Sequence, residues 1–309
     1  MTLLQDQRVP LAPDPVDTPV ADILAITPAV LDADTQALRA SWLHGRSPHS
    51  TRAYRANAGR FLAFVATPLS AVTLADLQRY ADSLAAADLA PASQARMLAA
   101  VKSLLTFAHT TGFIPYNVGR GLRLPGVRGR LAERIPTEEQ VLSLLAHEPN
   151  RRNHALIRLL YAAGLRLSEA CSLCWRDLVP RGEVGQVTVW GKGEKERAVL
   201  LTAGTWAELQ ALRPASAAPD DPVFRSRHGR PLSPTQAWRV VKAAAKRAGL
   251  ASAPAFSPHW LRHAHASHAL DRGAPISLVR DGLGHASLAT TSRYMHARPG
   301  DGVGTYLPI

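Results

Sequence analysis

The sequence predicts a mainly α-helical protein of two domains with one small β-hairpin in the second, which places it in the α+β class. Its 309 residues exceed the size at which a single hydrophobic core stops growing, about 250–300 residues, so two domains are expected. From Thr35 onward, apolar residues recur mostly at helical spacing. Apolar and polar residues alternate around Val187–Trp190 and Arg197–Leu201, which is typical of strands.

Residues 1–36 are predicted to form a disordered tail. Prolines lie among small and acidic residues, a composition that opposes both helix and strand. These prolines are Pro10, Pro13, Pro15, Pro19 and Pro28. No fold is therefore expected in this stretch.

Residues 37–118 are predicted to form a helical bundle, the first folded domain. Ser47 and Pro48 have the pattern of a helix start, with a capping side chain and proline at the first helical position. Thr73 and Asp76 have the spacing of a capping box. Because no alternating segment occurs here, we expect helices alone.

Residues 119–135 are rich in glycine and arginine and contain prolines, so they are predicted to form the interdomain linker. Arginines in an exposed strap can simply keep it solvated, but their guanidinium groups also suit DNA phosphates. The candidate DNA-binding residues of the linker are Arg120, Arg123, Arg128, Arg130 and Arg134.

Residues 136–300 are predicted to form the second domain, and residues 301–309 a short C-terminal tail. Thr137 and Gln140 begin its first helix as a capping box. The two alternating runs, joined by a Gly-Lys-Gly-Glu-Lys turn, predict the hairpin. Thr205 with Glu208 predicts a further helix start.

The net charge of +12 favours an anionic partner. Residues 1–46 hold three arginines and six aspartates, so the rest of the chain carries a net +15. Nucleic acid is the favoured polyanion, because the basic residues are spread among apolar helices and do not form one membrane-surface helix.

Several protein classes are excluded by composition. Two cysteines cannot build a disulfide scaffold, and Cys171 and Cys174 lack the second pair that a zinc ribbon needs, so both are interpreted as buried structural thiols. No window approaches the ~18 apolar residues of a membrane span, and no cationic segment precedes an apolar run at the N-terminus. We therefore expect a soluble, cytoplasmic protein with no membrane partner.

Four segments of the second domain carry polar residues within well-patterned elements. Each alone has an ordinary explanation, such as a solvated arginine, a charged hairpin tip or a core tyrosine. The His259 and His263 spacing is that of half a zinc-protease helix, but Trp260 replaces the required glutamate, so no metal site is predicted. The turn lacks a complete Walker pattern, so no nucleotide site is predicted either. Together, these segments supply six candidate catalytic residues: Arg166, Lys192, His259, Arg262, His285 and Tyr294.

The strings that hold these residues resemble the tyrosine recombinase family, also called the lambda-integrase or phage integrase family, and especially its Xer-like branch. The resemblance covers about residues 40–300 and rests on Gly-Leu-Arg166-Leu-Ser-Glu169, Gly-Lys192-Gly-x-Lys-Glu-Arg, His259-x-Leu-Arg262-His, Leu-Gly-His285 and Arg-Tyr294-x-His. It implies a SAM-like core-binding domain, a catalytic domain over 136–300 and a C-shaped clamp around double-stranded DNA.

The resemblance also implies roles for the main residues. Tyr294 would be the nucleophile that attacks the scissile phosphate and forms a 3′-phosphotyrosyl link. Arg166 and Arg262 would clamp the phosphate, since a guanidinium offers paired donors and a permanent charge. Lys192 would be the general acid toward the leaving 5′-oxygen, because an ammonium group can donate a proton.

Supporting roles and partners follow from the same resemblance. His259 would assist proton transfer at the tyrosine, His285 would hydrogen-bond the phosphate, and Glu169 would orient Arg166. No metal ion, ATP or other cofactor is implied. The expected assembly is a homo-oligomer, a tetramer on two DNA sites, with a second recombinase left open as a partner.

Two other functions remain as alternatives. A type IB-like DNA topoisomerase would use the same chemistry to relax supercoils, although such enzymes usually carry lysine where His259 stands. A non-catalytic DNA-binding protein would keep the fold, although the complete set of six residues argues against decay. The motifs are compatible with element integration, plasmid resolution and chromosome segregation alike.

Overall fold

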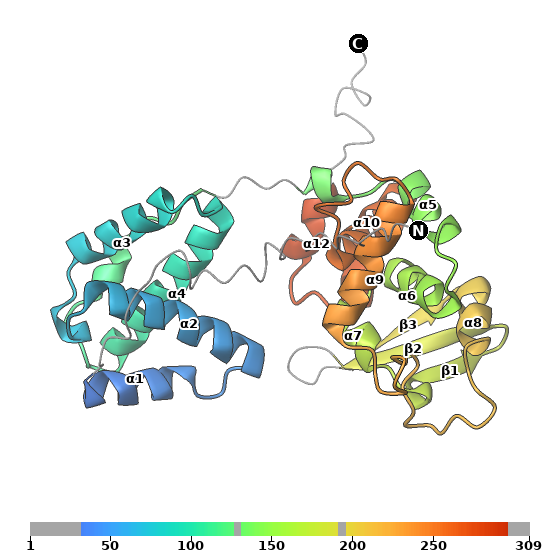
Figure 1. Ribbon diagram of the computed structural model, residues 1–309, viewed down its shortest axis with the longest axis horizontal. Helices are drawn as coiled ribbons and strands as arrows, with labels where there is room; N and C mark the ends of the chain where they lie inside the picture. Colours follow the sequence, from blue (N-terminus) through green and yellow to red (C-terminus); the bar gives the residue numbers. More distant parts are fainter. Residues whose placement is uncertain (1–31, 127–130, 191–195, 296–309) are drawn as a thin grey trace, which may run out of the picture. The chain divides into compact units, whose positions relative to one another are not determined.

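The structure, a computed structural model, describes residues 32–126, 131–190 and 196–295. The chain divides into two compact units, Met1–Gly129 and Arg130–Ile309 (Figure 1). The division falls within the predicted linker over 119–135. In the described residues both units are helical and the second also holds a small antiparallel sheet, which confirms the predicted fold class.

The first unit is a helical bundle around an apolar core. Phe61, Leu77 and Tyr80 are fully buried in it, and the rings of Phe61 and Tyr80 meet edge to face with centroids 5.3 Å apart. Its described elements are α1 (Ala33–Leu43), α2 (Pro48–Val65), η1 (Leu69–Ala71), α3 (Leu74–Ala86), α4 (Pro91–Thr110) and η2 (Val118–Gly121).

The helix starts of this unit follow local capping chemistry. The side chain of Ser47 accepts a hydrogen bond from the amide of Ser50, and the Thr73–Asp76 capping box is complete, so both predicted starts are confirmed. Helix α1 begins earlier than the predicted boundary at residue 37. The reason is Asp32, whose carboxylate accepts from the amide of Thr35 at 2.7 Å.

The second unit surrounds a larger core with helices and a sheet. Its described helices are η3 (Ala132–Arg134), α5 (Glu138–Ala146), α6 (Arg151–Ala162), α7 (Leu167–Ser172), η4 (Trp175–Asp177), α8 (Ala203–Gln210), α9 (Pro234–Arg247), α10 (Pro258–Asp271), α11 (Ile276–Leu283) and α12 (Leu288–Met295). The predicted capping box at Thr137 is present, and a second box, made by Ser233 and Gln236, begins α9.

The predicted hairpin is part of a three-stranded antiparallel sheet. The strands are β1 (Leu178–Arg181), β2 (Val184–Trp190) and β3 (Glu196–Leu201), in the order β1-β2-β3, with Val187 opposite Val199. The sequence did not predict β1, because it is short and contains Pro180, a residue that sheets accept at their edges.

The predicted start of α8 at Thr205 is wrong. Thr202 caps this helix by accepting from the amide of Thr205, and the helix begins at Ala203. Glu208 is instead paired with His154 and Arg158 of α6. A tertiary ion pair therefore uses the carboxylate that the local pattern assigned to a cap.

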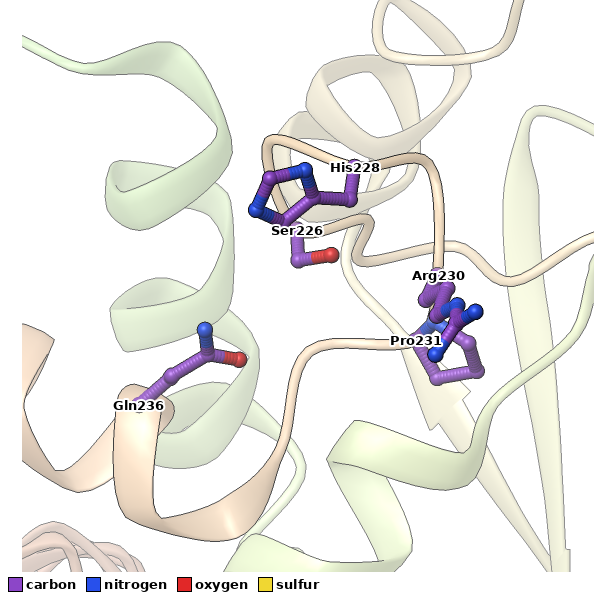
Figure 2. A pocket seen from close by; sticks show the side chains of 5 residues that line it. All are labelled: Ser226, His228, Arg230, Pro231 and Gln236. Carbon is purple, nitrogen blue, oxygen red and sulfur yellow. The ribbon is translucent and has the colours of Figure 1, made fainter.

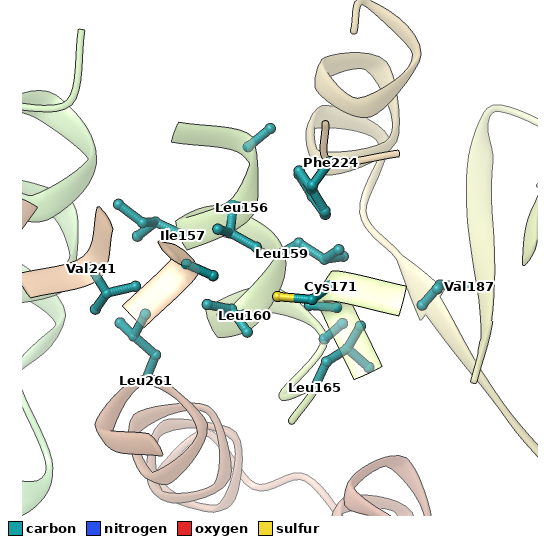
Figure 3. Packing of buried hydrophobic residues seen from close by; sticks show 14 of the residues in the cluster. Leu156, Ile157, Leu159, Leu160, Leu165, Cys171, Val187, Phe224, Val241 and Leu261 are labelled. Carbon is teal, nitrogen blue, oxygen red and sulfur yellow. The ribbon is translucent and has the colours of Figure 1, made fainter. Parts of the chain in front are cut away.

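Helix α6 lies in the middle of the core of this unit (Figure 3). Leu156 and Leu160 are fully buried there with Leu261 of α10 and Phe224. This packing fixes α7 and α10, the helices that carry the predicted arginines.

The two cysteines have different environments. Cys171 is buried in α7, as predicted, and burial raises the pKa of its thiol to about 11. Cys174 is only half-buried and lies beyond the end of α7, not inside a helix, because the helix stops at Ser172.

Among the residues that the structure describes, no helix combines the length and the apolar character that crossing a membrane requires.

Candidate active site

Three arginines converge on the turn that ends α11. Three consecutive carbonyl oxygens each accept from a different guanidinium: Gly282 from Arg197 at 2.9 Å, Leu283 from Arg262 at 2.5 Å and Gly284 from Arg166 at 3.5 Å. The last carbonyls of a helix lack intrahelical donors and carry partial negative charge, so cations are stabilised there. The turn thereby gathers residues from α7, β3 and α10.

Arg166 is placed by a tight turn before α7. Gly164 has φ = +59°, and a Cβ at this position would lie 2.6 Å from Cδ2 of His265, so a glycine is required there. Arg166 then caps α7 together with Glu169, whose carboxylate accepts from the Arg166 amide at 2.7 Å and from its Nη1 at 2.7 Å. The Arg166 side chain remains 38% exposed, so it is accessible to a ligand.

Arg262 is buried in α10, with 2% of its surface exposed. Besides Leu283, it donates to the carbonyl of Gly164 at 2.5 Å. Burial, together with the nearby charge of Arg166, lowers the pKa of Arg262 to about 10. The guanidinium therefore stays charged at neutral pH and is held by the two turns that flank the site.

Tyr294 and His285 lie next to each other at the end of the chain's described part. Tyr294 is 6% exposed on α12, and its ring lies nearly parallel to that of His285 with centroids 6.4 Å apart. Burial raises the pKa of the Tyr294 hydroxyl, while Arg262 and Arg293 oppose that shift.

His285 follows the left-handed Gly284, which ends α11. Its Nδ1 lies 2.8 Å from the hydroxyl of Thr291. Burial and the charges of Arg262 and Arg166 lower its pKa to about 4, so the imidazole is neutral near pH 7. A neutral imidazole held by one nitrogen can still offer the other to a ligand.

His263 is a site residue that sequence reasoning missed. Its Nδ1 lies 2.8 Å from the hydroxyl oxygen of Tyr294, and burial lowers its pKa to about 3. The available signal was its position next to Arg262, on the same face of α10 as His259.

His259 is in ring contact with His263 on α10. It lies at the exposed start of α10 and its ring meets that of His263 edge to face, with centroids 4.5 Å apart. Desolvation by the packed surroundings and the charges of Arg262 and Arg166 lower its pKa. In the described residues, His263 contacts the hydroxyl of Tyr294, and His259 contacts His263.

The other predicted residues are distributed as follows. Lys192, Arg128 and Arg130 lie outside the described residues. Arg120, Arg123 and Arg134 are exposed. Arg134 lies close enough to His259 and His263 for its charge to lower the pKa of both imidazoles.

A surface pocket in the second unit is lined by none of the predicted residues. It lies between the loop before α9 and the first turn of α9 (Figure 2). Its lining residues are Ser226, His228, Arg230, Pro231 and Gln236. This pocket shares no residue with the cluster of arginines, histidines and Tyr294 around the α11 turn. That cluster is the candidate site.

Comparisons with known proteins identify the family of the chain. The Phage integrase family matches residues 135–300, and the phage integrase N-terminal SAM-like domain matches residues 42–112. The chain is 35% identical over 276 residues to tyrosine recombinase XerD of Vibrio vulnificus, covering 84% of this chain and 89% of that protein. It is 34% identical over 263 residues to tyrosine recombinase XerC of Xylella fastidiosa, covering 82% and 87%.

Solved structures share the fold. A lambda integrase dimer bound to a COC′ core site matches with a TM-score of 0.70 and 16% identity, over 94% of this chain and 83% of that one. XerH site-specific recombinase bound to palindromic difH substrate matches with a TM-score of 0.66 and 20% identity, over 89% of each chain. The chain therefore belongs to the phage integrase family and is a tyrosine-type site-specific recombinase.

Proposed function

We propose that the chain cuts and rejoins double-stranded DNA through a covalent 3′-phosphotyrosyl intermediate at Tyr294, without metal or ATP. The carrying observation is that Tyr294, His285, Arg262 and Arg166 are gathered around one turn although they lie far apart in sequence. A phenol beside two guanidinium groups is the set that phosphate transesterification needs.

The chemical step exchanges one ester bond for another. The hydroxyl oxygen of Tyr294 bonds to phosphorus, the bond from phosphorus to the 5′-oxygen breaks, and that oxygen takes a proton from Lys192. Arg166 and Arg262 neutralise the non-bridging oxygens as charge develops on them, and His285 donates a further hydrogen bond. The phenolic proton leaves through the hydrogen bond to His263 or to water.

The proposed absence of metal and ATP follows from this balance. Two fixed guanidinium charges supply the stabilisation that a divalent cation supplies in many nucleases. Because the phosphotyrosyl link conserves the bond energy of the phosphodiester, religation to a new 5′-hydroxyl needs no external energy. Reversal of the step on a second duplex completes strand exchange.

The DNA partner and the assembly are part of the proposal. The net charge of +15 outside residues 1–46 and the exposed Arg120, Arg123 and Arg134 suit a phosphate backbone. The neighbours that share the fold include a lambda integrase dimer on a core site, which supports an oligomer of this chain on DNA.

Covalent capture tests the mechanism. A pool of nicked suicide duplexes with randomised arms is incubated with the full chain in EDTA and without ATP, and adducts that survive denaturation are isolated and sequenced. We expect an adduct with the unmodified chain and no adduct with Tyr294→Phe. The control is Tyr161→Phe, which should still form the adduct, because the hydroxyl of Tyr161 pairs with His268 and not with a residue of the proposed mechanism.

Two results would contradict the proposal. One is the absence of any adduct with the unmodified chain, and the other is an adduct that persists in Tyr294→Phe. Once a duplex has been selected, product topology separates the functions: recombinant molecules indicate a recombinase, and relaxed plasmid alone indicates a topoisomerase.

A further inference from the structure

Arg197 is the third arginine at the α11 turn. It lies on β3, its side chain is 10% exposed, and its Nε donates to the carbonyl of Gly282 at 2.9 Å. The neighbouring carbonyls of the turn bind Arg262 and Arg166. Arg197 thus takes part in the same arrangement as the two proposed phosphate-binding arginines.

Arg197 also shares a carboxylate with Arg166. Its two terminal nitrogens donate to the two oxygens of Glu169, at 3.0 and 2.7 Å. The same oxygens accept from the backbone amide and from Nη1 of Arg166. Burial raises the pKa of Glu169, but the hydrogen bonds from Arg197 and Arg166 outweigh it and the pKa is lowered, so this carboxylate is ionised.

The charges of this group depend on Arg197. Arg166, Glu169 and Arg197 together carry one net positive charge. If Arg197 were removed, Glu169 and Arg166 would form a pair with no net charge. The charge of Arg166 would then be largely cancelled at the phosphate, although Arg166 itself remained in place.

The turn before His285 packs directly on Arg197. Gly284 has φ = +64°, and a Cβ there would lie 3.2 Å from Cδ of Arg197. The backbone that leads into His285 is therefore positioned against the arginine side chain as well as hydrogen-bonded to it.

We infer that Arg197 is a positioning residue, which holds Arg166 and the Gly284–His285 turn in fixed relation and keeps Glu169 from cancelling the Arg166 charge. This inference rests on the proposed function, because the effect is exerted on the same phosphate. Arg197 acts through these residues and does not itself touch the DNA.

The test uses the captured duplex under single-turnover conditions. We expect Arg197→Gln to lower the rate of adduct formation at saturating DNA about tenfold or more, as for a small misplacement of catalytic groups. Its affinity for the duplex stays within about threefold of the unmodified chain, which indicates an effect on the transition state.

The matched control is Arg247→Gln. Arg247 of α9 binds the buried Glu148 and the carbonyl of His147, so it is a comparable arginine–glutamate pair away from the cluster. We expect this variant to lose stability as Arg197→Gln does, but to form the adduct at a rate within about twofold of the unmodified chain.

A second substrate separates positioning from a general structural defect. A methylphosphonate at the scissile position is neutral, so it depends less on the charge of Arg166, and the deficit of Arg197→Gln should shrink to about threefold or less. A loss of folded protein would lower both rates equally, and the ratio of the two rates is independent of the folded fraction. If Arg197→Gln does not fold, Arg197→Lys is compared on the same two substrates.

Equal deficits on the two substrates, or no deficit, would overturn the role of Arg197. A failure of the unmodified chain to form any adduct is a different result, which would overturn the proposed function and this inference with it.

Discussion

The Nδ1 of His263 lies 2.8 Å from the hydroxyl oxygen of Tyr294, which joins α10 to α12 at the candidate nucleophile. Burial, followed by the charges of His259 and Arg134, lowers the pKa of His263 to about 3. The imidazole is therefore neutral near pH 7, and with its proton on Nε2 it accepts the hydrogen bond from the phenol. This contact holds the hydroxyl in one orientation.

Replacing His263 by phenylalanine should slow adduct formation. The phenol would keep its packing but lose its acceptor, and an unpaired buried hydroxyl costs about 1–3 kcal/mol. Because the nucleophile would no longer be held in one pose, we expect the single-turnover rate on the captured duplex to fall about tenfold.

The control for this prediction is His263→Gln, whose amide oxygen can accept from Tyr294. We expect it to recover part of the rate, and His228→Phe, at an exposed site, to leave the rate unchanged. A rate for His263→Phe equal to that of the unmodified chain would show that the hydrogen bond does not position the nucleophile.

The parts of the fold that depend on neighbouring residues were predictable from sequence. The capping boxes at Thr73 and Thr137 combine a side chain and an amide three residues apart, so the local pattern specifies them completely. The predicted start of α8 was wrong because Glu208 has distant partners in α6, which a local sequence pattern does not contain.

The site was predictable in its residue types and not in its contacts. His259 and His263 lie on one face of α10, and only the packing of α12 decides that His263 is the one that reaches Tyr294. The role of Arg197 depends on the alignment of β3 with the end of α11, which joins residues 85 positions apart.

Gly164→Ala should destabilise the second unit more than the same substitution at another glycine with a similar φ. Gly164 has φ = +59°, and an added Cβ would lie 2.6 Å from the ring of His265 and 2.9 Å from Leu283. Gly182 has φ = +62° with nothing within 4 Å of an added Cβ, so Gly182→Ala measures backbone strain alone. We expect the loss of stability to be larger for Gly164→Ala by about 1–3 kcal/mol, the usual cost of overpacking.

Thermal unfolding of the full-length variants checks this prediction. Because Gly164 precedes Arg166, the same variant should also lower the rate of adduct formation, whereas Gly182→Ala should not. Equal melting temperatures for the two variants would mean that the turn relaxes without cost.

Acid should destabilise the second unit through the half-buried imidazoles of His263 and His285. Burial, ahead of neighbouring charges, lowers the pKa of His263 to about 3 and that of His285 to about 4. An unfolded histidine titrates near about 6.5, so between these values the unfolded chain binds more protons and stability rises with pH. Lowering the pH from about 6.5 toward 4 therefore removes stability, by up to about 1.4 kcal/mol per pH unit for each histidine.

The measurement is the unfolding free energy of the full chain at a series of pH values. We expect His263→Gln to give a shallower dependence than the unmodified chain over this range, since one titrating group is gone. His228→Gln, which removes an exposed histidine, should leave the slope unchanged. Parallel curves for all three proteins would rule out His263 as a source of the acid sensitivity.

DNA binding should weaken steeply with salt, and the linker arginines should account for part of the dependence. Each phosphate contact contributes about 0.9 to the slope of log K against log[salt], because neutralised phosphates release counterions. Arg123 and Arg134 are exposed in the described part of the linker, so Arg123→Gln and Arg134→Gln should each reduce the slope by about 1. Arg176→Gln is the control, since Arg176 is an exposed arginine paired with Asp220 and should leave the slope unchanged. Fluorescence anisotropy with the captured duplex from about 50 to 200 mM salt measures these slopes. Unchanged slopes in both linker variants would place Arg123 and Arg134 outside the DNA interface.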